Sequence, residues 1–311
     1  MRGGFNVHIF DIVTLTPIEY GWSGDKKYRA LTSDGTPYFL RITARERDDR
    51  FVKLFDLQKE VAATGIPMCE PIAMGECDEG IYAVHTWIDG VDAEATVPTL
   101  PAEVQYRLGR DAGEYLTHIH SIPAPADQPD WETRFNAKID RKIKLYAECP
   151  IHFEGDEHLL HYIEENRHLL HNRPQTFQHG DYHIGNMMLT NAETNPQIVV
   201  IDFDRYDFGD PWEEFNRIVW CAQAAPVFAT GLVDGYFGVD ETTTVPMDFW
   251  RLLALYISSN MLSSVPWAIP FGKREITTML NQARDVLAWY DNMHHPVPAW
   301  YGRPYSSNKE I

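Results

Sequence analysis

Hydrophobic and polar positions predict a β-hairpin near the middle of the chain. Residues 187–190 (MMLT) and 197–201 (QIVVI) are strand-like, and the second segment is rich in β-branched residues. The intervening residues 191–196 are of turn-forming types. In an antiparallel hairpin, the positions just before the first strand and just after the second lie side by side. We therefore expect Asn186 and Asp202 to lie close together at the open end of this hairpin.

The first quarter of the chain has the pattern of a β-rich unit. Residues 20–43 predict three strands, with a glycine- and serine-containing turn at 20–28 and a hairpin turn at 33–36 (SDGT). Residues 71–75 and 80–87 predict a second hairpin. Between them, apolar residues at helical spacing predict a helix over 51–63, and Gly65 and Pro67 mark its end.

Later segments have mainly helical periodicity. The expected helices cover residues 101–120, 131–149, 156–171, 249–261 and 276–293. A further helix start is predicted at Asp210, which would be the N-cap. Pro211 would be the first helical residue, and Glu213 would complete a capping box with Asp210.

Composition narrows the class of protein. The 311 residues are 44% hydrophobic, enough for a substantial core. The net charge of −18 argues against nucleic-acid binding as the main task, whereas an acidic face would suit a cationic substrate. The four cysteines have no CxxC spacing, which favours a reducing cytosol. We expect no signal peptide and no membrane span, because no apolar run approaches about 18 residues.

The hairpin is preceded by a loop that carries candidate catalytic chemistry. Asp181 lies five residues before Asn186, in a loop that contains Gly180 and Gly185. Two carboxylates and one amide oxygen should thus converge where Asp181, Asn186 and Asp202 meet. Oxygen ligands of this kind suit Mg²⁺, which prefers few protein ligands together with phosphate oxygens.

Taken in order, these motifs resemble the aminoglycoside phosphotransferase and choline kinase family, whose members share the protein-kinase-like fold. The resemblance rests on His179-Gly180-Asp181, on Asn186 and on Ile201-Asp202-Phe203-Asp204. It implies an α+β, bilobal fold, with a small β-rich nucleotide-binding lobe over 1–87 and a larger, mainly helical catalytic and acceptor-binding lobe over 88–311. A DPxxD pattern of the family also matches, except that Glu214 stands where Asp is usual.

The resemblance also implies a role for each motif. Asp181 would be the catalytic residue that orients the acceptor hydroxyl and takes its proton, and Asn186 and Asp202 would hold Mg²⁺. The residues expected to bind the nucleotide are Ser23, Gly24, Arg41, Thr86 and Ile88. Supporting roles fall to His179 and Asp204, and to the acid that pairs with Arg41, for which Asp56, Glu60 and Glu46 are candidates.

The implied activity is phosphorylation of a hydroxyl group on a small molecule with ATP or GTP as co-substrate. The acceptor could be an aminoglycoside-type antibiotic or a metabolite such as choline, homoserine or a sugar. The motifs do not distinguish these acceptors, and they do not set the oligomeric state. One alternative is a metal-dependent hydrolase built on His179, Asp181, His183, Asp202 and Asp204. Another is a kinase-like binding protein with weak catalysis.

Overall fold

The computed structural model describes residues 11–19, 24–44 and 48–302, and the chain forms two compact units. Unit 1 comprises Met1–Val91 together with Met187–Asp204. Unit 2 comprises Asp92–Asn186 together with Arg205–Ile311. The sequence predicted a boundary between residues 87 and 88, which is four residues before the observed boundary between Val91 and Asp92. The predicted hairpin belongs to unit 1, although it follows the first half of unit 2 in sequence.

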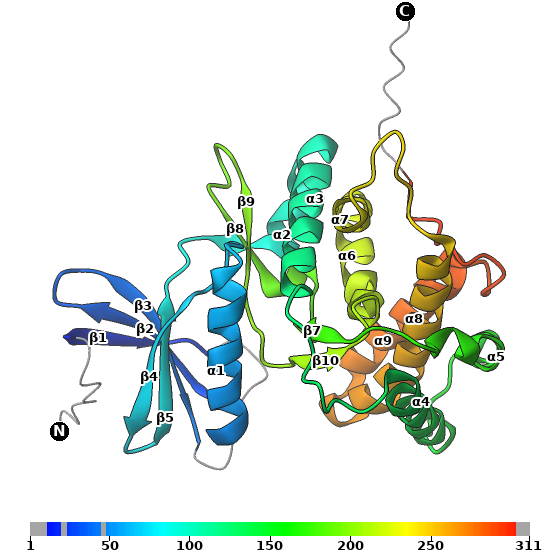
Figure 1. Cartoon of the computed structure of the whole chain (residues 1–311), viewed down its shortest axis with the longest axis horizontal. Coiled ribbons are helices and arrows are strands. Elements are labelled where there is room, and N and C mark those ends of the chain that lie inside the picture. The colour runs from blue at the N-terminus through cyan, green and yellow to red at the C-terminus, as the bar shows by residue number, and fades with distance from the viewer. Residues whose placement is uncertain (1–10, 20–23, 45–47, 303–311) are drawn as a thin grey trace, which may run out of the picture. The chain divides into compact units, whose positions relative to one another are not determined.

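Unit 1 is built on a five-stranded antiparallel sheet with the strand order β1-β2-β3-β5-β4 (Figure 1). Its strands are β1 (Ile12–Pro17), β2 (Lys26–Thr32), β3 (Pro37–Thr43), β4 (Pro71–Cys77) and β5 (Gly80–Thr86). Helix α1 (Asp48–Ala63) packs against β4 and β5 through Phe51 and Phe55. The first strand lies at residues 12–17, before the segment in which the sequence predicted three strands.

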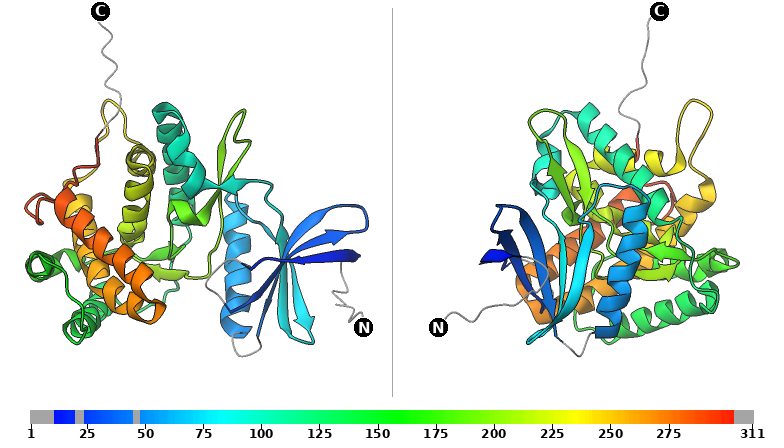
Figure 2. Two further views of the ribbon diagram at one scale, coloured as in Figure 1. Left: turned by 180° about the vertical axis from the view of Figure 1, so that it is seen from behind. Right: turned by 60° about the vertical axis from the view of Figure 1, so that its left-hand side comes forward.

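The predicted hairpin is present and completes unit 1. Strands β8 (Met187–Thr190) and β9 (Gln197–Val200) pair with Met187 opposite Val200, and the short β6 (Val91–Asp92) pairs with β8. The hairpin is tied to the segment after α1, because the Val200 amide donates to the Pro67 carbonyl at 2.9 Å. The Cys69 amide in turn donates to the Val200 carbonyl at 3.2 Å. Both views in Figure 2 show the hairpin as a narrow two-stranded extension.

Unit 2 is mainly helical, with one small two-stranded sheet of β7 (Thr176–Gln178) and β10 (Asp207–Gly209). Its α-helices are α2 (Ala93–Thr96), α3 (Ala102–Ile119), α4 (Trp131–Ala147), α5 (Asp156–Asn166), α6 (Ile218–Ala224), α7 (Pro226–Phe237), α8 (Met247–Ala268) and α9 (Lys273–Trp289). Short 3₁₀ segments are η2 (Val97–Thr99), η3 (Arg167–Leu170), η4 (Ile184–Asn186), η5 (Glu213–Arg217) and η6 (Ile269–Phe271).

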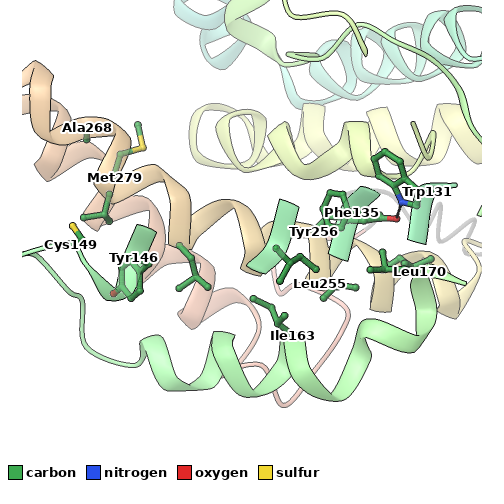
Figure 3. Packing of buried hydrophobic residues seen from close by; sticks show 14 residues of the cluster. Trp131, Phe135, Tyr146, Cys149, Ile163, Leu170, Leu255, Tyr256, Ala268 and Met279 are labelled. Carbon is green, nitrogen blue, oxygen red and sulfur yellow. Dashed lines mark hydrogen bonds between the residues drawn. The ribbon is translucent and has the colours of Figure 1, made fainter. Parts of the chain in front are cut away.

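The core of unit 2 forms where α4 and α5 pack against α8 (Figure 3). The Trp131 ring stacks on Phe135, and its indole N–H donates to the Tyr256 hydroxyl at 3.1 Å. That hydroxyl donates to the buried carboxylate of Asp210 at 2.5 Å. The aromatic core therefore holds the turn that starts at Asp210.

The capping box predicted at this turn does not form. The Asp210 carboxylate accepts from the Trp212 amide at 3.0 Å, but the segment that follows is the 3₁₀ helix η5. The Glu213 side chain does not reach back to residue 210. It bonds Lys138 of α4 at 3.1 Å, because the ion pair with a neighbouring helix competes with the local cap.

Helix α8 extends well beyond the predicted 249–261. Among the described helices, only the stretch Met247–Phe271 is long and apolar enough to cross a membrane by length and composition, which corrects our expectation that no such run exists. However, 72% of its apolar window is buried inside the protein, as expected of a core helix.

Helices α3 and α7 lie side by side, and glycines line their contact (Figures 1 and 2). A Cβ on Gly113 of α3 would lie 2.2 Å from the Leu232 carbonyl oxygen of α7. A Cβ on Gly235 of α7 would lie 2.2 Å from the Arg110 carbonyl oxygen. The two backbones can approach this closely only because side chains are missing there.

We expect Gly113→Ala to lower the free energy of unfolding by about 1–3 kcal/mol, the usual cost of overpacking. In an exposed helix the same change would raise it by up to about 1 kcal/mol. Urea unfolding measures the difference. Glu114→Ala, on the exposed neighbouring position, is the matched control and should change the value by less than about 0.5 kcal/mol. An unchanged or increased stability of Gly113→Ala would contradict the close packing.

Candidate active site

The loop after β7 is held in one conformation by a buried carboxylate. Glu214, which is 2% exposed, accepts hydrogen bonds from the amides of Gly180 at 3.0 Å and Tyr182 at 3.3 Å. Gly180 has φ of 84°, and a Cβ there would lie 2.0 Å from the Arg205 carbonyl oxygen. Only glycine therefore fits at position 180. Asp181 lies between the two anchored amides, and its side chain points toward a set of cations.

Two arginines surround the Asp181 carboxylate. Arg217 Nε lies 3.1 Å from Oδ1, and Arg205 Nε lies 3.4 Å from Oδ2. Burial raises the pKa of Asp181, but the charges of Arg217 and Arg205 outweigh it and hold the pKa below its ordinary value. The carboxylate is therefore ionised at neutral pH.

Two histidines flank Asp181 in sequence and have different surroundings. His179 is fully buried, and its Nδ1 accepts the Asp181 amide at 3.3 Å. His183 Nε2 lies 3.7 Å from the Asp181 carboxylate, and the His183 ring stacks on Trp220 with 5.9 Å between centroids. Burial lowers the pKa of His183 to about 4, so its ring is neutral at neutral pH. The His183 ring therefore adds no charge to the site.

Asn186 is the last residue of η4 and is oriented by the same loop. Its amide nitrogen donates to the Asp181 carbonyl at 2.9 Å. This hydrogen bond assigns the nitrogen as the donor and leaves the amide oxygen as an acceptor for a cation.

Asp202 follows the other strand of the hairpin, in unit 1. It has φ of 63°, a left-handed conformation that is uncommon for a residue with a side chain. Such backbone strain is concentrated at functional sites. Asn186 directly precedes Met187 of β8, and Met187 pairs with Val200 of β9. Asp202 lies two residues after Val200.

The donor chemistry of Asn186 and Asp202 fits Mg²⁺, which takes a few protein oxygens and keeps water or phosphate as other ligands. Within the described part of the chain, no group of three or more His, Cys, Asp or Glu side chains is arranged to hold a metal. The hydrolase alternative, which needs such a cluster at His179, Asp181, His183, Asp202 and Asp204, finds no support in the described residues.

Arg41 of β3 lies in a network of two carboxylates within unit 1. Its Nε donates to Asp25 at 2.6 Å, and its guanidinium bonds both oxygens of Asp204, one of them at 2.5 Å. Asp25 also accepts from the Thr43 hydroxyl at 2.6 Å. The acids expected to pair with Arg41 lie elsewhere: Asp56 pairs with Lys59 at 3.0 Å, and Glu60 is exposed.

The remaining nucleotide-binding candidates lie around the same sheet. Ser23, like Glu46, lies outside the described residues, and Gly24 is exposed and directly precedes Asp25. The Thr86 hydroxyl accepts from the Glu70 amide at 2.9 Å. Ile88, two residues beyond β5, makes no backbone hydrogen bond within the described residues, so its N–H and C=O are available to a ligand.

Sequence reasoning missed the charged residues that act over long separations. Arg217 and Glu214 reach the loop from η5, more than 30 residues away, and Asp25 reaches Arg41 from the position just before β2. Two of them carried a local signal: Glu214 belongs to the DPxxD-like pattern, although its bonds to the loop were not predicted, and Arg205 directly follows the IDFD motif.

Comparison with solved structures shows the fold. A choline/ethanolamine kinase family protein from Mesorhizobium loti is 17% identical, with a TM-score of 0.63 over 94% of this chain and 92% of that one. Amicoumacin kinase hAmiN, solved with AMP-PNP, Ca²⁺ and Ami, is 14% identical, with a TM-score of 0.60 over 91% and 90%. ADP-bound aminoglycoside phosphotransferase APH(2″)-Ib is also 14% identical, with a TM-score of 0.58 over 90% and 96%. The expected kinase-like α+β fold is thus confirmed.

Sequence comparison gives the family. No protein with a curated description matches the chain. The profile of the phosphotransferase enzyme family, in contrast, matches residues 14–250, which include β3 with Arg41, the Asp181 loop and the hairpin. Because this match covers most of the chain, the protein belongs to the phosphotransferase enzyme family.

Proposed function

We propose that this phosphotransferase uses ATP or GTP to phosphorylate a hydroxyl group of a small molecule. The observation that carries the proposal is the ionised Asp181 carboxylate on a loop whose amides are bonded by Glu214. Phosphoryl transfer needs little covalent help from a protein, so a fixed carboxylate that orients the acceptor hydroxyl is the main requirement.

In the proposed mechanism, Asp181 accepts a hydrogen bond from the acceptor hydroxyl and takes its proton as the phosphoryl group is transferred. Arg217 and Arg205 keep the carboxylate ionised and fix its rotamer. Because both arginines also place positive charge beside the reacting oxygen, they would stabilise the negative charge that develops on that oxygen as its proton passes to Asp181.

Asn186 and Asp202 are the residues that we propose hold Mg²⁺. Asn186 directly precedes β8, and Asp202 lies two residues beyond the end of β9, whose Val200 pairs with Met187. Bound Mg²⁺ would neutralise the charge of the nucleotide phosphates. His179 supports this loop by accepting the Asp181 amide.

The nucleotide would bind on unit 1. Ser23 and Gly24 would approach the phosphates through backbone amides, and Arg41 would add its guanidinium. Thr86 and Ile88 follow β5, where the backbone groups of Ile88 would bind the base. Asp25 and Asp204 occupy the guanidinium, so the phosphates would bind at the edge of an existing network.

The relatives named above are described as a choline/ethanolamine kinase family protein, an amicoumacin kinase and an aminoglycoside phosphotransferase, which supports a small-molecule acceptor. An aminoglycoside-type antibiotic, choline, homoserine and a sugar therefore stay candidate acceptors, and antibiotic resistance is one consequence to test. We further propose a cytoplasmic location, which agrees with four free cysteines.

A first prediction concerns nucleotide binding. Mg²⁺–ATP or Mg²⁺–GTP should raise the melting temperature, because a ligand that binds only the native state stabilises it by mass action. EDTA should remove most of the shift if Asn186 and Asp202 hold the cation. Differential scanning calorimetry makes both measurements. The absence of nucleotide binding with every divalent metal would end the kinase proposal, in favour of a binding protein or a hydrolase.

A second prediction concerns Arg41. Arg41→Ala would leave Asp25, whose side chain is fully buried, without its cation, so we expect lost stability as well as lost binding. Arg41→Lys keeps the charge and removes the bidentate geometry, and it should raise KM for ATP more than KM for the acceptor. The expected loss is about 1.5–3 kcal/mol, the scale of a charge-assisted hydrogen bond. A normal KM for ATP in a folded Arg41→Lys variant would show that another residue binds the phosphates.

A third prediction separates base chemistry from metal binding. Asp181→Asn removes the oxygen that takes the proton and should lower kcat by about 10²–10⁴, while Mg²⁺–ATP still binds. Asp202→Ala should instead weaken nucleotide binding in the presence of Mg²⁺. Titration calorimetry and single-turnover transfer on both variants make the comparison. If Asp181→Asn keeps a near-parental kcat, the assigned role of Asp181 is wrong.

A further inference from the structure

Both two-nitrogen edges of the Arg41 guanidinium are occupied, and both contacts lie within unit 1. The edge formed by Nε and Nη2 donates to one oxygen of Asp25, with Nε at 2.6 Å. The edge formed by Nη1 and Nη2 donates to the two oxygens of Asp204, and the Nη2 contact measures 2.5 Å. A guanidinium offers only these two edges for bidentate binding of an anion. A phosphate therefore cannot be bound bidentately by Arg41 until one of the carboxylates leaves.

The contact with Asp25 is unsuited to exchange. The Asp25 side chain is fully buried, and its second oxygen accepts from the Thr43 hydroxyl at 2.6 Å. Phe51 of α1 lies under the same guanidinium, with its ring centroid 5.3 Å from Arg41 Cζ. Separating a buried carboxylate from its cation leaves an uncompensated charge, which is strongly unfavourable. Asp25 and Phe51 thus hold Arg41 in place whether or not a ligand is bound.

The contact with Asp204 has the properties of an exchangeable one. The Asp204 side chain is 23% exposed, against 0% for Asp25. The backbone of Asp204 is held independently, because Arg50 Nη2 donates to its carbonyl at 3.1 Å and the preceding Phe203 is 1% exposed. Rotation of the Asp204 side chain alone can therefore release Arg41, and water can solvate the released carboxylate. A partly exposed ion pair is much easier to open than a buried one.

We infer that Asp204 is an internal competitor of the nucleotide: its carboxylate occupies on Arg41 the place of a phosphate and leaves when the phosphate binds. This inference rests on the proposed function, and it adds a means of regulation to the same site. A carboxylate and a phosphate offer the arginine fork the same pair of oxygen acceptors. Nucleotide binds only to the fraction of the protein in which Asp204 has left Arg41, so the contact lowers the apparent affinity.

The test measures nucleotide affinity after the competitor is removed. Asp204→Asn keeps the shape of the side chain and removes its charge. In titration calorimetry, we expect it to tighten binding of Mg²⁺–ADP or Mg²⁺–GDP by about 10-fold, the scale of one charge-assisted hydrogen bond. Adenosine and guanosine, which lack phosphates, should bind with unchanged affinity. Asp78→Asn is the matched control, because it removes an exposed carboxylate from the turn between β4 and β5 and should change neither affinity.

A double-mutant cycle separates competition for the fork from simple charge repulsion between Asp204 and the phosphates. Arg41→Lys keeps the positive charge but has no two-nitrogen edge. If Asp204 competes for that edge, Asp204→Asn should tighten binding by only about 3-fold or less in the Arg41→Lys background. Repulsion alone would give the full gain there. If Arg41→Lys does not fold, acetate replaces this arm: it should weaken nucleotide binding by Asp204→Ala more than chloride of equal ionic strength does.

The outcomes separate this inference from the proposed function. Unchanged or weaker nucleotide binding by Asp204→Asn overturns the competitor role, and weaker binding would show that Asp204 contacts the bound nucleotide or its metal. An undiminished gain in Arg41→Lys, or equal effects of acetate and chloride, also overturns it. These results leave the phosphotransferase proposal intact, because nucleotide still binds. If neither the parent nor Asp204→Asn binds any nucleotide, the proposed function itself is refuted, and the inference falls with it.

Discussion

The proposed chemistry depends on one buried carboxylate that does not itself react. Glu214 accepts the amides on both sides of Asp181, and its own charge is taken out of water at 2% exposure. The two amide donors compensate part of the cost of burying that charge. The same hydrogen bonds constrain the backbone of the loop. The Glu214 carboxylate thus fixes two backbone positions of the loop at once. Positioning of Asp181 is therefore set from η5, and η5 is anchored through Asp210 to the aromatic core.

The total charge of a protein is a poor guide to the charge at its site. A net charge of −18 first suggested a cationic substrate, yet the groups that contact the Asp181 carboxylate include two arginines. Exposed carboxylates elsewhere on the surface are screened within about 10 Å by salt. Partly buried groups such as Arg217 are screened much less, so they dominate the local electrostatic field.

Sequence reasoning succeeded where the signal was local. The hairpin strands, the turn between them and the long amphipathic helices α3, α4 and α9 follow from the spacing of residues that are close in sequence. It failed where partners are distant in sequence. Glu213 was expected to cap its own helix, but Lys138 on α4 takes its carboxylate; Arg41 was expected to pair with α1, but Asp25 and Asp204 hold it. Such pairs are set by tertiary packing, which a single sequence does not display.

The assignment of the β8–β9 hairpin to unit 1 has a consequence for how the molecule comes into being. The chain passes from one unit to the other after Val91, after Asn186 and after Asp204, so neither unit is a continuous segment. During synthesis, unit 1 lacks its last two strands until residue 204 has left the ribosome, by which time half of unit 2 has already emerged. Cutting the gene near residue 91 would thus leave unit 1 without its hairpin, whereas all of unit 2 would lie in the second fragment. Unit 1 can be completed only after the first half of unit 2 has been made, and its completion closes a long loop.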